Sequence, residues 1–346
     1  MLRLDVDVSS KYANRSYRRL KYIISILSIL VGLLCLTGFI WTSIDGNINS
    51  KLIDECKNDT QTTILCFIRL ITTNALRTEW DKYIMVTLLF TYASVFLHII
   101  VESTRTNVSG LLGQMIIQTI FIIVGIGVCF PILFIPSFLH FYKSKNNLNK
   151  SPVPIDIVCI GIIYIICVII VPTYLLYFFS SHELIASIMS IILLISPLGF
   201  ALISLPFRLL SGVTQRCWVI NSHRLIVHCQ ITLFILSAPL FFITLVSLIM
   251  HGSFDSIKQS YVTENTNEIN PITFIWSIDY ISLFISLILF IISNEYLFHD
   301  NINRNRSSKI KQIIGYISFS IIFIITPCLA FPLYIAWQEY HYLIPT

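Results

Sequence analysis

Long apolar segments recur along this chain, and each is long enough to cross the hydrocarbon core of a bilayer. A helix of about 20 apolar residues spans that core of ~30 Å. Eight such segments cover residues 22–41, 83–101, 111–141, 155–179, 184–207, 231–250, 274–293 and 313–337. The sequence therefore predicts an all-α fold, a polytopic membrane helix bundle of about eight transmembrane helices, within a range of about seven to nine.

The composition agrees with a location in the membrane. Of the 346 residues, 55% are hydrophobic and only 12% are charged, and the mean hydropathy is +0.80; a soluble domain carries about 25% charged residues. Lys and Arg in the loops of a membrane protein account for the formal charge of +5, and no soluble basic domain remains to bind nucleic acid. The lipid bilayer is an expected partner, and nucleic acid is not.

The chain divides into three parts. Residues 1–21 form a basic N-terminal tail, expected to be retained rather than cleaved, because the apolar segment after it is too long for a signal peptide. Residues 22–82 hold the first transmembrane helix and a long loop, in which residues 64–76, interrupted by Arg69, are expected to be amphipathic or re-entrant. Residues 83–343 form the main helical bundle. We find no internal repeat in the sequence, which weighs against an inverted-repeat transporter.

Cysteines and short motifs give no sign of a metal or cofactor. The nine cysteines show no metal-ligand spacing, and the chain has no CxxC, HExxH, P-loop or GxGxxG motif. We therefore expect no metal and no cofactor. Cys56 and Cys66 share the first long loop and would form a disulfide only if that loop faces an oxidising lumen.

Basic residues give conflicting orientations for eight crossings. The connections after the third, fifth and seventh segments hold Lys143, Lys145, Lys150, Arg208, Arg216, Arg224, Arg304, Arg306, Lys309 and Lys311. The positive-inside rule places these connections in the cytoplasm. The basic tail should also be cytoplasmic, but eight crossings put it on the other side. Either the tail is an exception or residues 42–82 add a crossing.

The order of crossings also predicts which polar residues meet. The turns after the second, fourth and sixth segments should share one membrane face with the C-terminus. The residues gathered there would be Glu102, Arg105, Gln114, Gln118, His182, Glu183, Trp276, Asp279, Tyr280, Gln338, Glu339 and His341. If Glu102 and Asp279 share a site, their carboxyl groups should lie within about 15 Å, because proton transfer needs hydrogen-bond reach or one bridging water.

A polar stripe runs along the second apolar segment into the sequence FLHIIVESTRTN (96–107). Its members, spaced three or four residues apart, are Thr87, Thr91, Ser94, His98, Glu102 and Arg105. That spacing places them on one face of a helix, where Glu102 and Arg105 can pair. The stripe is either one wall of a polar cavity or a hydrated helix end, and His98 is either a proton carrier or a hydrogen-bonded packing residue.

Asp279 is the most informative single residue. It lies about five residues, or ~8 Å, inside the segment 274–293, and Ser282, Ser286 and Ser293 continue its helical face. A carboxyl group at that depth normally faces the bundle interior, where an apolar site keeps it neutral and able to act as a general acid. The alternative is an interfacial Asp that precedes a helix beginning later.

Five segments in order resemble one family. They are ESTRTN (102–107), VGIGVCFPILFIPSFLHF (124–141), VIIVPTYLLYF (168–178), FIWSIDYISLF (274–284) and LYIAWQEYHYL (333–343). They resemble the integral-membrane terpene cyclases of fungal meroterpenoid pathways, of the ascochlorin type, over roughly residues 83–343. The resemblance rests on an acidic-x-x-Arg-x-Asn helix end, a G-x-x-Phe-Pro helix, an aromatic-Asp-Tyr helix and a Trp-acidic C-terminus.

The resemblance implies proton-initiated cyclisation of a prenyl chain on a polar or aromatic core, an isomerase or lyase reaction in terpenoid biosynthesis that needs no metal. Asp279 would be the acid and Glu102 a second acid or base. Trp276 and Tyr280 would line the cation path, while His98, Arg105 and Gln114 complete the substrate site. The substrate would be a hydrophobic small molecule, and the endoplasmic reticulum or another endomembrane is favoured over the plasma membrane.

Two other classes remain open from the residues alone. A seven-helix receptor is compatible with the basic loops if one segment is discounted, and an even number of crossings would oppose it. A small-molecule transporter or channel is compatible with the polar stripes, and a path through the bundle would favour it.

Overall fold

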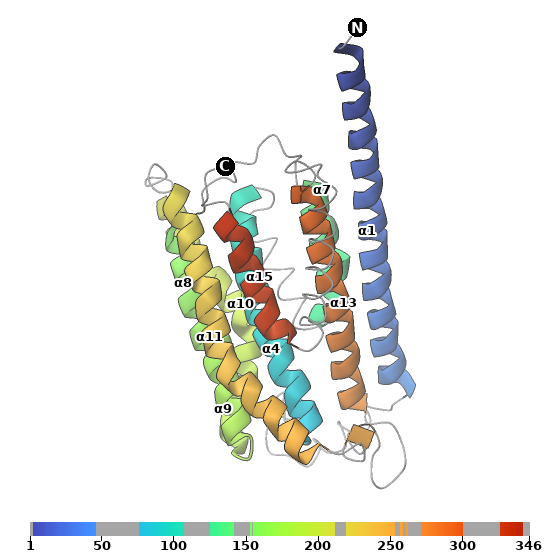
Figure 1. The fold of residues 1–346 in the computed structure, drawn as a ribbon. Helices are drawn as coiled ribbons and strands as arrows, with labels where there is room; N and C mark the ends of the chain where they lie inside the picture. The colour runs from blue at the N-terminus through green and yellow to red at the C-terminus, as the bar shows by residue number, and fades with distance from the viewer. Residues whose placement is uncertain are drawn as a thin grey trace.

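The computed structural model describes residues 3–45, 76–106, 125–141, 153, 155–211, 219–252, 257–258, 261, 271–299 and 326–341 (Figure 1). All regular secondary structure in these ranges is helical. The predicted all-α membrane bundle is confirmed.

Six helical segments within the described ranges are long and apolar enough to cross a membrane. They are α1 (Arg3–Asp45), α4 (Glu79–Thr106), the continuous run of α8 (Ile155–Ile165), η3 (Ile166–Ile170) and α9 (Val171–Phe179), α10 (Glu183–Ser211), α11 (Val219–His251) and α13 (Pro271–His299). Each matches one predicted segment, and the protein is a multi-pass membrane protein. The predicted basic tail is helical from Arg3 and continuous with the first span.

Helix α4 forms the centre of the bundle. Nearly all of its side chains are buried, including the polar Thr87, Thr91 and Ser94, because α8, α11, α13 and α15 pack around it. Helix α1 differs, since much of its surface is exposed apolar side chain. An apolar surface of this kind suits contact with lipid, whereas a helix that is buried on every side has to find protein partners for its polar groups.

Two further helices begin inside the bundle. The α6–α7 segment (residues 126–141) consists of α6 (Ile126–Cys129), η1 (Phe130–Phe134) and α7 (Ile135–Phe141), and the other helix is α15 (Pro327–His341). They are the later parts of the predicted segments 111–141 and 313–337, whose earlier parts lie outside the described residues. Figure 1 shows both helices starting part-way along the bundle and rising to the end where the chain termini lie.

The structure corrects the predicted sidedness of the turns. Gly161 faces Leu97 and Ile100, and the Phe90 and Tyr174 rings lie 6.0 Å apart, so α4 and the α8–α9 run are antiparallel. The turn after the fourth segment therefore lies at the opposite end from the turn after α4. The physical reason is that α4 and α7 end at the same end of the bundle, so α8, which follows α7, starts at that end as well (Figure 1).

The same correction removes the conflict between the membrane orientations that the basic tail and the basic connections indicated. The start of α1 and the ends of α7, α10, α13 and α15 all lie at one end of the bundle, here called the termini end (Figure 1). The basic tail is therefore at the same end as the helix ends that precede the basic connections in the sequence. The opposite end, here called the far end, holds the end of α1, the start of α4 and the turn after α9.

The bundle contains an approximate two-fold repeat that the sequence analysis did not find. The first unit is α1, α4 and the α6–α7 segment, and the second is α11, α13 and α15. Their packing corresponds pair by pair: α1 packs on α13 and α6–α7, as α11 packs on α4 and α15. Likewise α6 packs on α13 as α15 packs on α4. Because both units run in the same direction, this is a parallel repeat rather than an inverted one.

Matching residues confirm the correspondence. Phe-Pro stands at the fifth and sixth positions of both short helices, as residues 130–131 and 331–332. Helices α4 and α13 align from their first residues, which pairs Asp81 with Thr273 and His98 with Phe290. Both pairs are in contact: Thr273 donates a hydrogen bond to Asp81 at 2.9 Å, and the His98 and Phe290 rings are 5.4 Å apart. Equivalent residues that touch lie on the two-fold axis, which passes between α4 and α13.

Candidate functional site

Asp279 holds the buried start of the α6–α7 segment. Its Oδ1 accepts a hydrogen bond from the Gly127 backbone N–H at 2.7 Å, and the Ser282 hydroxyl donates to the Gly127 carbonyl at 2.5 Å. Gly125, just before the helix, has φ of 105°, a conformation that favours glycine. A Cβ at Gly127 would collide with the backbone oxygen of Asp279, so glycine is what allows this approach.

These contacts assign Asp279 a role in the fold. The first N–H groups of a helix have no partner inside the helix, and leaving them unpaired within a membrane is costly. A carboxyl oxygen at this point satisfies one of them and complements the positive end of the helix dipole. Asp279 is buried, as its depth in the sequence predicts, and its partner lies 152 residues away in the chain.

The structure does not bring Asp279 and Glu102 into one site. The Asp81–Thr273 hydrogen bond fixes the register of α4 and α13, which run side by side in the same direction (Figure 1). Asp279 lies about 9 Å beyond this level and Glu102 about 32 Å beyond it, at 1.5 Å per residue. Their separation along the bundle is thus about 22 Å, more than a shared site allows, so the structure places the two carboxyl groups in different parts of the bundle.

The other predicted site residues divide into the same two groups. Trp276 and Tyr280 lie with Asp279 in the half of the bundle nearer the far end, whereas His98, Glu102 and the backbone of Arg105 lie in the half nearer the termini end. His98 and Glu102 are both buried. The Arg105 side chain and the whole of Gln114 lie outside the described residues.

His98 lies in an aromatic cluster on the two-fold axis. Its imidazole meets the rings of Phe134, Phe290 and Phe331 edge to face, with centroids 6.1, 5.4 and 6.0 Å away. Phe130 and Phe138 extend the cluster through Phe290, at 6.1 and 5.1 Å. The two short helices and α13 thus surround a side chain of α4 with rings whose π faces attract positive charge.

Polar pairs lie above and below the cluster. The Ser94 hydroxyl, one turn of α4 nearer the far end, donates to Gln230 at 2.8 Å. Glu102 lies one turn of α4 nearer the termini end. At about its level, His223 Nδ1 and Glu339 Oε2 are 2.7 Å apart and buried, joining α11 to α15. Along the bundle, the imidazole of His98 therefore has carboxyl groups on one side and the hydroxyl–amide pair of Ser94 and Gln230 on the other.

Sequence reasoning missed much of this neighbourhood. Phe134, Phe290 and Phe331 are three of 24 phenylalanines. The repeated Phe-Pro pair could have singled out the helices of Phe134 and Phe331, and α13, which holds Phe290, has no such pair. His223 precedes the predicted segment 231–250, whereas α11 begins at Val219 and includes it.

No known protein or metal arrangement identifies the site. Among the described residues, no group of three or more His, Cys, Asp and Glu side chains is placed to hold a metal ion. Comparison of the chain with protein-family models, curated proteins and solved structures gives no match in any of the three. The geometry of the residues themselves is therefore the basis for a function.

Proposed function

We propose that the protein is a membrane-embedded cyclase-like enzyme that carries out proton-initiated cyclisation of a prenylated substrate, at a site between α4 and α13 around His98. The observation that carries this proposal is a buried imidazole enclosed by aromatic rings with a buried carboxyl group one helical turn away. This combination provides both a proton source and a cation-stabilising wall. The terpene-cyclase resemblance of the sequence supports the same reaction class.

In the proposed reaction, the acid is Glu102, with His98 as its neighbour in proton exchange. The acid protonates a terminal alkene or an epoxide oxygen, and the carbocation that forms is attacked by the next double bond of the chain. Phe134, Phe290 and Phe331 stabilise the positive charge as it moves. Loss of one proton from the final cation restores the acid, so the product is an isomer of the substrate and water must be excluded until that step.

The proposed location follows from the substrate and the charges. A prenylated substrate dissolves in the bilayer and can reach a site between membrane helices directly. The basic tail starts at the termini end, and the helices that precede the basic connections in the sequence end there, so this end would face the cytoplasm by the positive-inside rule. We place the protein in the endoplasmic reticulum or another endomembrane, where terpenoid biosynthesis supplies such substrates.

The test is turnover of a prenylated phenol carrying a terminal epoxide by membranes that contain the protein. Glu102→Gln keeps the shape of the side chain and removes the acid, so we expect turnover to fall at least about 100-fold. Asp279→Asn is the control, because the amide oxygen can still accept the Gly127 N–H. Wild-type turnover in Glu102→Gln, or loss of turnover only in Asp279→Asn, would contradict the proposed acid.

Transport is the second candidate, and one observation favours it. The α6–α7 segment and α15 both begin inside the bundle, in two units that repeat in parallel, and interrupted helices at a repeat interface are a feature of transporters. An assay of the purified protein distinguishes the two candidates. An enzyme converts its substrate in detergent, whereas transport can be measured only across the membrane of a sealed vesicle. A seven-helix receptor fits less well, because its termini lie on opposite faces and here both lie at one end (Figure 1).

A further inference from the structure

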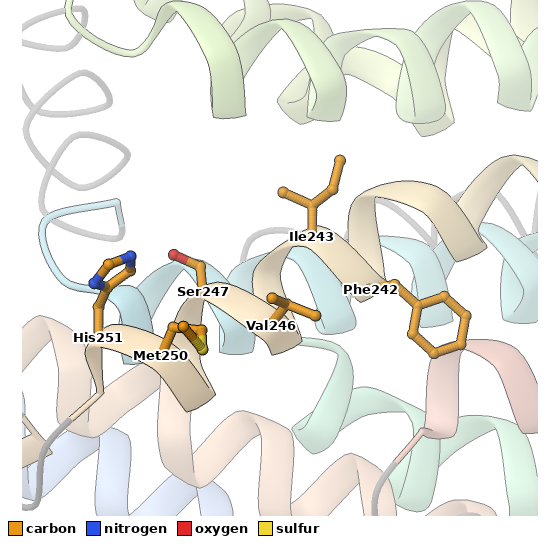
Figure 2. A pocket seen from close by; sticks show the side chains of 6 residues that line it. All are labelled: Phe242, Ile243, Val246, Ser247, Met250 and His251. Atoms are coloured by element: carbon orange, nitrogen blue, oxygen red, sulfur yellow. The ribbon is translucent and has the colours of Figure 1, made fainter.

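A shallow groove lies on the outer surface of α11, at the far end and away from the His98 cluster. It has a volume of about 430 Å³ and is lined by Phe242, Ile243, Val246, Ser247, Met250 and His251 (Figure 2). Its apolar lining is open, with Val246 56% and Met250 72% exposed. In a membrane-spanning helix such a surface faces lipid.

One end of the groove is polar and charged. Ser247, in the lining, donates a hydrogen bond to Glu79 at 2.6 Å, and Glu79 forms an ion pair with Lys82 at 2.7 Å. The Glu79 and Lys82 side chains are each 26% exposed, so both charges remain accessible. His251 closes this end at the last residue of α11. A carboxylate, an ammonium and an imidazole therefore lie together where α4 begins and α11 ends.

The length of the groove matches one leaflet of a bilayer. From Phe242 to His251 the helix rises about 14 Å, close to half of a hydrocarbon core of ~30 Å. The apolar lining thus lies at the depth of an acyl chain, and the charged end lies at the depth of lipid headgroups.

The geometry points to a binding site for a zwitterionic phospholipid of the leaflet at the far end. One acyl chain lies along Phe242, Val246 and Met250. The headgroup phosphate pairs with Lys82 and His251, and its ammonium pairs with Glu79. A purely anionic headgroup fits less well, because its phosphate would compete with Glu79 for Lys82 and would bring no cation to Glu79 in exchange. This site is independent of the proposed cyclisation.

The purified protein in detergent, incubated with either phosphatidylethanolamine or phosphatidylglycerol and examined by native mass spectrometry, tests the site. We expect one retained phosphatidylethanolamine and weaker retention of phosphatidylglycerol. Val246→Trp fills the groove and should weaken phosphatidylethanolamine retention about tenfold, as loss of contact with two methylene groups would. Ile235→Trp is the matched control, since Ile235 is exposed on the same helix outside the groove, and it should retain lipid normally.

Lys82→Met separates a headgroup site from general lipid contact. It should remove the preference for phosphatidylethanolamine while the protein remains folded, because the aliphatic part of the side chain is kept. Equal retention of both lipids by the wild type, or equal loss in Val246→Trp and Ile235→Trp, would overturn the proposal.

Discussion

The short helices of the two repeated units start at similar depth, but different groups stabilise the two helix starts. In the first unit, Asp279 and Ser282 of α13 bind the N–H and carbonyl of Gly127. In the second, α15 begins with Thr326 and Pro327, and Pro at the first position has no N–H to satisfy. The α4 residue equivalent to Asp279 is Thr87, whose hydroxyl bonds within its own helix. The second unit therefore has one donor fewer at the start of its short helix, whereas the first unit has an acceptor from α13, Asp279.

The units also differ in the side chains that they place at the two-fold axis. His98 of α4 faces Phe290 of α13, and the position of Glu102 is taken by Asn294. Phe138 of the first short helix corresponds to Glu339 of the second. Aromatic packing is common to both units, since Phe130 meets Phe290 at 6.1 Å as Phe331 meets His98 at 6.0 Å. His98, Glu102 and Glu339 are titratable, whereas their equivalents in the other unit are not. We therefore propose that the function lies at these residues.

Making the first short helix resemble the second should have the largest effect on folding. Gly127→Cys copies Cys328, the equivalent residue of α15, and its Cβ would collide with the backbone of Asp279. We expect a loss of about 3 kcal/mol in stability, from overpacking at a rigid contact. Thermal unfolding in detergent measures it, with Cys328→Gly as the reciprocal control. Equal stability of the two variants would mean that the starts of the two short helices are packed equally tightly, which would contradict the prediction.

Removing the acceptor at Asp279 should have the next largest effect. Asp279→Ala leaves the Gly127 N–H without this acceptor and should cost about 1–3 kcal/mol. Asp279→Asn keeps an oxygen in place and should lose less. The same thermal measurement distinguishes them, and similar losses in both variants would show that charge, rather than the hydrogen bond, stabilises the helix start.

Replacing His98 with the residue found at the equivalent position of the second unit should leave the fold nearly unchanged. His98→Phe copies Phe290 and keeps an aromatic ring among Phe134, Phe290 and Phe331, so we expect stability within about 1.5 kcal/mol of the wild type. Turnover of the prenylated phenol should nevertheless be lost. A variant that is both stable and fully active would remove His98 from the site.

The smallest perturbation removes a glycosylation sequence and tests which end of the two units faces the cytoplasm. Asn58-Asp59-Thr60 is an N-glycosylation sequence between α1 and α4 in the chain, and α1 ends and α4 starts at the far end. Asn149 and Asn305 begin similar sequences that follow α7 and α13, which end at the termini end. If the termini end is cytoplasmic, expression in a glycosylating host should give a mass increase that Asn58→Gln abolishes. An increase lost instead in Asn149→Gln or Asn305→Gln would reverse the orientation.

The sequence predicted the spans well because apolar length is a local property. Six of its eight segments correspond to full spans, and the depth of Asp279 indicated a buried carboxyl group. The partner of that carboxyl group depends on packing between distant helices, and so does the entry of α6–α7 and α15 part-way along the bundle. The repeat was missed because its strongest trace is two residues, Phe-Pro, in short helices whose other residues mostly differ.

The most direct measurement of the central claim is an experimental structure with the prenylated phenol, or a non-reactive analogue of it, bound. We predict that its prenyl chain lies between α4 and α13 in contact with His98, Phe290 and Phe331, with Glu102 nearest the reacting end. A ligand found beside Asp279 and Tyr280 instead would contradict the account, since it would make the helix-holding carboxyl group the catalytic one.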